Sequence, residues 1–124
     1  MNPLTEIISK LEKATGPSRY LDAEIAAAVG LDTGMFIWDG QRNFVGVQNN
    51  ITVPHYTSSI DSALTLVPEG DPWTLGQNIH HRHWLACVNE YGPDQEVRSR
   101  GTGTHPTSAA IALCIAALRS RGEQ

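Results

Sequence analysis

The feature that most constrains this chain is its closing segment, PTSAAIALCIAALRS, which predicts a helix over about residues 106–120. Ile111, Cys114, Ile115 and Leu118 recur at helical spacing and form an apolar stripe, which must lie against a core. The alanines between them permit close backbone packing. The chain must therefore supply another layer of structure for this helix to pack on.

Three more helices are predicted, at residues 4–13, 19–29 and 59–67, each from an apolar stripe of period 3.6. Ser58 and Asp61 have the spacing of a capping box at the start of the third. Five short strands are predicted from alternation and turn signals, at residues 35–38, 44–47, 72–79, 81–91 and 95–101.

Strands and helices segregate along the chain instead of alternating strictly, which favours an antiparallel sheet. We expect a single α+β domain over residues 1–124. The predicted architecture is one sheet of about five short strands packed between or against four helices, similar to an α/β/α sandwich. The GTGTHPTS segment is predicted to be a loop that leads into the last helix.

Charge argues against one broad class of partner. The formal net charge is −4, and the chain has two lysines, Lys10 and Lys13, and seven arginines. Duplex nucleic acid is an unexpected partner, because binding its backbone requires a basic face. No apolar run approaches the ~20 residues that span a bilayer, so we expect a cytoplasmic protein and no membrane contact.

The sequence contains no pattern typical of nucleophilic catalysis, and Cys87 and Cys114 both lie in apolar segments. We therefore predict no catalytic residue, no cofactor and no enzymatic activity. His81 and His83 would share a strand face with Cys87, so a zinc-dependent hydrolase is an alternative. The alternative for the cluster of His80, His81 and His83 is a polar turn, and we assign no metal ligand.

The residues support anion binding better than they support catalysis or metal binding. RSRGTGTHPTSAA brings glycines, hydroxyls and a helix N-terminus together, with Arg98 and Arg100 just upstream. An ordinary glycine-rich loop capped by Thr104 is the alternative. Tyr56 beside a second helix start offers another such place. Arg19, in the first turn of a helix, is expected to bind either Asp22 at i+3 or a ligand.

Three segments, TGPSRYLDAEIAAAVG, VPHYTSSIDSALTLVPEG and HPTSAAIALCIAALRSR, resemble the phage ABA sandwich domain family. The resemblance covers a little under half of the chain. It implies an α/β/α or α+β sandwich in a small phage protein. A subset of such proteins is similar to anti-Thoeris sponges, homo-oligomers that sequester cyclic ADP-ribose isomers or cyclic oligonucleotides without cleaving them.

The resemblance thus implies a phage counter-defence protein in the host cytoplasm that sequesters an anionic nucleotide signal as a homo-oligomer. A small inhibitor module that docks on a host protein is the main alternative. The residues expected to contact the ligand are Arg19, Tyr56, Thr57, Trp84, Arg98, Arg100, Thr104, His105 and Thr107.

Overall fold

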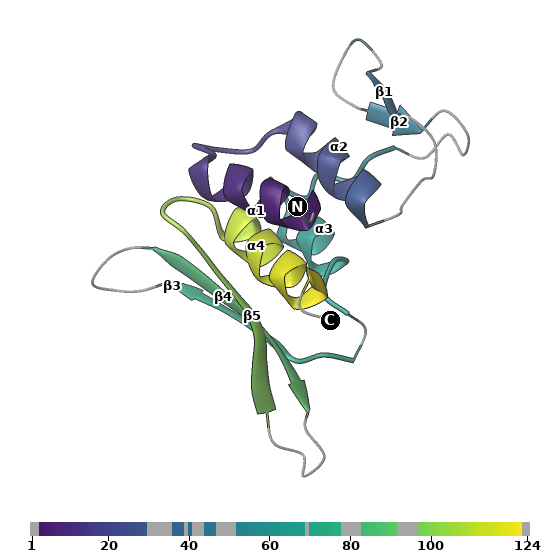
Figure 1. Cartoon of the computed structure of the whole chain (residues 1–124). Helices are drawn as coiled ribbons and strands as arrows, with labels where there is room; N and C mark the ends of the chain where they lie inside the picture. Colours follow the sequence, from purple (N-terminus) through teal and green to yellow (C-terminus); the bar gives the residue numbers. More distant parts are fainter. Residues whose placement is uncertain are drawn as a thin grey trace.

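The described residues of the protein form four helices and two antiparallel sheets (Figure 1). The computed structural model describes residues 3–29, 36–38, 40, 44–46, 52–68, 70–77, 83–91 and 97–122. In chain order the elements are α1 (Pro3–Lys13), α2 (Arg19–Ala28), β1 (Phe36–Trp38), β2 (Phe44–Gly46), α3 (Ile60–Leu64), β3 (Trp73–Gln77), β4 (Trp84–Tyr91), β5 (Val97–His105) and α4 (Ala109–Gly122). The predicted α+β class and the four predicted helices are confirmed.

The five strands do not form the single sheet that the sequence predicted. β3, β4 and β5 form one antiparallel sheet in that order, and β1 and β2 pair separately as a hairpin. Figure 1 shows the hairpin lying beyond α2, away from the larger sheet. Gly40 lies between its strands with φ of 86°, a left-handed conformation that glycine adopts without strain.

Helix α4 is the centre of the fold. Every residue from Ala110 to Leu118 is buried, because the three-stranded sheet covers one side of the helix and α1 and α3 cover the other. In Figure 1 the described helices all lie on one side of this sheet, so the layers run sheet, α4, then α1 and α3. Of the two arrangements that the sequence left open, the described residues show helices against one face of the sheet and not on both (Figure 1).

β5 is longer than predicted, and this changes the interpretation of the glycine-rich segment. GTGTH continues the strand to His105, and its alternate residues Gly101, Gly103 and His105 are buried. A Cβ on Gly103 would lie 2.3 Å from the Ala112 carbonyl oxygen, and one on Gly101 would lie 2.4 Å from that of Ala116. The glycines are therefore required for the close approach of α4 to the sheet, and the prediction of a loop here was wrong.

Helix starts also differ in detail from the predictions. Ser59, not Ser58, caps α3: its hydroxyl accepts from the Ser62 amide at 3.2 Å. Helix α4 begins at Ala109, three residues later than expected, and Ser108 accepts from the amide of Ile111 at 3.1 Å. The sequence identified the capping regions but not the register of each cap, because neighbouring serines and threonines are equally able to accept.

Candidate functional site

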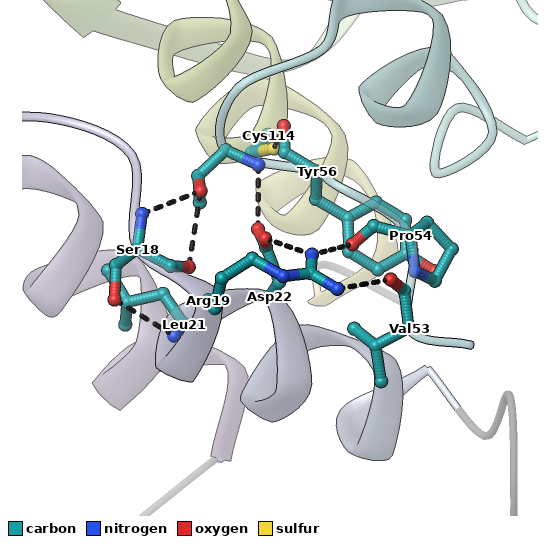
Figure 2. A network of polar contacts seen from close by, with 9 residues as sticks. Ser18, Arg19, Leu21, Asp22, Val53, Pro54, Tyr56 and Cys114 are labelled. Carbon is teal, nitrogen blue, oxygen red and sulfur yellow. Dashed lines mark hydrogen bonds and ion pairs between the residues drawn. The ribbon is translucent and has the colours of Figure 1, made fainter. Parts of the chain in front are cut away.

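A buried polar network joins the start of α2 to the segment 53–57, two of the three regions that the sequence singled out (Figure 2). Its centre is Asp22, which is 1% exposed. One carboxylate oxygen accepts from the amide of Thr57 at 2.8 Å, and the other pairs with the Arg19 guanidinium at 2.6 Å. A buried carboxylate is stable only when it is paired in this way.

Arg19 extends the network to the next segment of backbone. Its guanidinium also donates to the carbonyl oxygens of Pro54 at 3.0 Å and Val53 at 2.7 Å. The Arg19–Asp22 pair at i and i+3 was one of the two predicted outcomes, and it is confirmed. Three acceptors from the protein itself thus surround this guanidinium, which fixes α2 against the chain that precedes α3.

Thr57 and Tyr56 lie inside the protein. Thr57 is fully buried; its hydroxyl accepts from the Ser18 amide at 2.9 Å and donates to the Ser18 carbonyl oxygen. Tyr56 is 2% exposed, and burial raises the pKa of its phenol. Its carbonyl oxygen accepts from the thiol of Cys114 at 3.2 Å. With its ring enclosed, Tyr56 offers no surface on which a base could stack.

His105 forms a second cluster, at the start of α4. Its Nδ1 faces the amides of Thr107 at 3.2 Å and Ser108 at 2.9 Å, so this nitrogen must accept. The ring proton therefore lies on Nε2, which donates to the carbonyl oxygen of Ala14 at 2.7 Å. The neutral imidazole fixes the start of α4 to the turn between α1 and α2.

The amides that the sequence analysis offered to an anion at this helix start are thus partly used by the protein. His105 takes those of Thr107 and Ser108, and Ser108 takes that of Ile111. The side chains of Thr104 and Thr107 are exposed. The side chains of Arg98 and Arg100, like His80 and His81, lie outside the described residues.

Three of the predicted contact residues, Arg19, Thr57 and His105, form two groups that both reach the turn at residues 14–18. Arg19 and Thr57 meet at Asp22 beside Ser18, whereas His105 contacts Ala14. Trp84 is partly buried against the core and lies opposite His105 in the sheet. Thr104 belongs to neither group, because alternation points its side chain to the opposite face of the sheet from His105.

The seam between α1 and α2 is hollowed on the surface beside this turn. One hollow of about 630 Å³ is lined by Leu4, Ile7, Ala27, Ala28 and the charged side chains of Glu6, Lys10 and Glu24. A second of about 480 Å³ is lined by Lys10, Lys13, Leu21 and residues 14–18. Both volumes fall within the range of small-molecule sites, about 300–1,000 Å³.

The two lysines of the chain therefore border the same seam, which sequence analysis did not identify as a site. Lys10 pairs with Glu24 at 2.8 Å, and this contact raises the pKa of the Lys10 ammonium. Lys13 is exposed at the rim of the second hollow. Their positions on α1 were readable from the sequence, but the packing of α2 beside them was not.

The described residues contain no group of three or more histidine, cysteine, aspartate or glutamate side chains that could hold a metal ion. His83 is exposed at the start of β4, and Cys87 lies on the same face of the sheet. Burial raises the pKa of the Cys114 thiol, with Asp22 as a smaller cause, so this thiol remains protonated and unreactive. None of the helices in the described part of the chain has the length and apolar character needed to cross a membrane.

Comparison with known proteins finds no matching family model, no matching curated protein and no matching solved structure.

Proposed function

We propose that this chain binds a small anionic nucleotide, a cyclic ADP-ribose isomer or a cyclic oligonucleotide, and sequesters it without cleaving it. In a phage-infected cell this activity would remove a signal of the host defence. The family resemblance of three segments suggests the ligand class. The observation that carries the proposal is the hollow seam between α1 and α2, which both lysines border.

The two ends of the seam differ in charge: Glu6 and Glu24 line the larger hollow, which suits a base and not a phosphate, whereas the second hollow is lined by lysines. Leu4, Ile7 and the alanines of α2 provide an apolar wall against which a base can lie, and Lys13 provides a cation at the other end. Lys10 lines both hollows and so lies between the two ends. Ligand sites combine such apolar walls with a few polar groups that fix orientation. No cleavage chemistry is proposed.

Binding is tested by the shift in melting temperature with a panel of cyclic ADP-ribose isomers and cyclic di- and trinucleotides. A ligand present far above its Kd stabilises the folded state by a few kcal/mol. We expect Lys13→Glu to abolish the shift and Lys13→Arg, which keeps the charge, to preserve it. The ligand released on heating should be chemically intact; recovery of a cleaved product would indicate an enzyme instead.

A protein-binding module is the second candidate, because one face of the three-stranded sheet is open. Leu85 is 45% exposed on this outer face, beside a hollow of about 310 Å³ that Thr74, Gly76 and Gln77 help to line. Such a face can accept an apolar side chain of a host protein. This candidate predicts that no nucleotide shifts the melting temperature and that Leu85→Lys abolishes partner binding while Lys13→Glu does not.

A further inference from the structure

β3 is an edge strand whose outward hydrogen-bonding groups can be identified. The Pro72 carbonyl oxygen accepts from the Asn89 amide at 2.8 Å, so Pro72 faces β4. In an antiparallel pair the residues alternate between facing the partner strand and facing away from it. Thr74 and Gly76 therefore bond to β4, whereas the backbone N–H and C=O groups of Trp73 and Leu75 point to the open edge.

The other edge of the sheet confirms this phase, and one of its outward carbonyl oxygens is bonded. The backbone N–H and C=O groups of Cys87 point toward Thr74 of β3. The backbone groups of Thr102, which lies opposite Cys87 in β5, must therefore point away from β4. The Thr102 carbonyl oxygen indeed accepts from the Arg119 guanidinium at 2.8 Å. Among the described residues no strand or side chain bonds in this way to the outward groups of Trp73 and Leu75.

The open edge lacks the features that usually prevent pairing. Natural edge strands carry charges or prolines that block the addition of another strand. β3 reads WTLGQ, with no charge and no proline, and the ring of Trp73 is 43% exposed. An uncharged strand with an exposed aromatic at an open edge is suited to receive another strand.

We propose that β3 pairs with β3 of a second copy of this chain, antiparallel and centred on Leu75, so that two three-stranded sheets become one. At the centre, Leu75 of each copy donates its amide to the carbonyl oxygen of the other. Trp73 then lies opposite Gln77 of the second copy, and Thr74 lies opposite Gly76. The two-fold axis makes each contact occur twice.

Two features of this strand suit pairing with a second copy. A Cβ at Gly76 would meet no atom within 4 Å, so the Thr74 side chain of the second copy has space there. The chain carries a net charge of −4, so two copies repel in general, and an uncharged strand is a place where they can meet. Each Trp73 ring can cover the Gln77 side chain opposite it.

The size of the contact sets the expected strength. A five-residue strand is roughly 17 Å long. Pairing along it buries less than the ~800 Å² per partner of a standard interface. We therefore expect a weak dimer whose population depends on protein concentration, and not a permanent one.

Sedimentation velocity over a wide concentration range tests the pairing in the intact chain. Leu75→Pro removes the outward amide, a change that edge strands tolerate. Leu75→Ala removes the same side chain contacts but keeps the amide. We expect the proline variant to weaken association at least tenfold relative to the alanine variant. The matched control Leu85→Gln, on the outer face and without a change of net charge, should leave association unchanged.

A wild-type protein that stays monomeric at every concentration would overturn the proposal. So would a dimer that Leu85→Gln dissociates and Leu75→Pro does not, because the outer face would then be the interface. If the proline variant does not fold, hydrogen exchange of the wild type decides. Exchange of the Trp73 and Leu75 amides should slow as concentration rises, and concentration-independent exchange would contradict the pairing. Neither result depends on nucleotide binding.

Discussion

The two faces of the three-stranded sheet are built from the same strands, but one face is buried under α4 and the other is exposed. On the inner face, Ala86, Val88, Gly101 and Gly103 lie against α4, and all four are buried. On the outer face, Leu85 and the threonines of β3 and β5 are exposed. Strand alternation places one residue of every adjacent pair on each face. Adjacent residues are therefore matched probes of a buried and an open environment.

The comparison shows where this fold leaves sequence free to change. The inner face must use small residues because the backbone of α4 lies directly on β5. The outer face of the described sheet has no such constraint, yet its described side chains in β3 to β5 include no aspartate, glutamate, lysine or arginine. A surface that is free to vary and nevertheless lacks charge is typical of an interaction surface.

The largest difference between the faces is expected for glycine substitution. Gly103→Ala would place a methyl group 2.3 Å from the Ala112 carbonyl oxygen and 2.7 Å from the Ala116 amide nitrogen. Backbone atoms of a helix cannot move aside, so we expect a loss of about 3 kcal/mol or more in the free energy of unfolding. Urea unfolding followed by circular dichroism measures it.

Gly76→Ala is the matched control, since the added Cβ meets nothing within 4 Å. Its effect should stay within about 1 kcal/mol. Equal losses for the two alanine variants would contradict the close approach of α4 to β5.

The second effect concerns His105, which points inward, and its neighbour Thr104, which points outward. His105→Leu leaves the amides of Thr107 and Ser108 and the Ala14 carbonyl oxygen without their partner. We expect a loss of about 2–3 kcal/mol, the cost of buried groups left unpaired. Thr104→Val removes an exposed hydroxyl and should change stability by less than about 0.5 kcal/mol. Thermal unfolding of both variants provides the comparison, and a larger loss for Thr104→Val would reverse it.

A smaller effect separates the two cysteines, Cys87 on the outer face and the buried Cys114 of α4. Burial raises the pKa of Cys114, so the folded thiol stays protonated while the unfolded chain ionises above about pH 8.5. The stability that the buried Cys114 thiol contributes is therefore present below that pH and is lost as the pH rises.

Cys114→Ser should cost about 1 kcal/mol at neutral pH and reduce this alkaline loss. Cys87→Ser should neither lower the stability at neutral pH nor reduce its loss at alkaline pH. Labelling of the folded protein by a thiol reagent should modify Cys87 and leave Cys114 unmodified until unfolding. Equal labelling of the two would show that Cys114 is accessible.

The local sequence pattern was sufficient to predict the helices and strands, but it was insufficient to predict how they pack together. The helices and the β3–β4 pair follow from apolar periodicity, which is a property of neighbouring residues. That α4 is covered on both sides, and that the hairpin of β1 and β2 stands apart, depends on contacts between distant segments. The GTGT segment shows the limit most clearly. Glycine is common both in loops and in strands under a closely packed helix, and only the position of α4 distinguishes them.

The site was predictable to a similar degree. Spacing alone identified the Arg19–Asp22 pair, because residues three apart on a helix are neighbours. The burial of Tyr56 and His105 was not predictable, since both side chains also suit exposed binding positions. The lysines of the α1–α2 seam were overlooked because a site made by two helices side by side leaves no motif in the sequence.

Threonine substitutions in β4 compare the two faces most directly, because the same residue is placed on each face. Val88→Thr would place a hydroxyl on the fully buried inner face, at a cost of about 1–2 kcal/mol. Leu85→Thr puts the same residue on the outer face, where the side chain is 45% exposed, and should change the free energy of unfolding by less than about 0.5 kcal/mol. Denaturant unfolding at low protein concentration compares them. A loss at Leu85 as large as that at Val88 would mean that something covers the outer face in the folded protein. The protein-binding candidate would then need a different surface, because a face already covered cannot receive a partner.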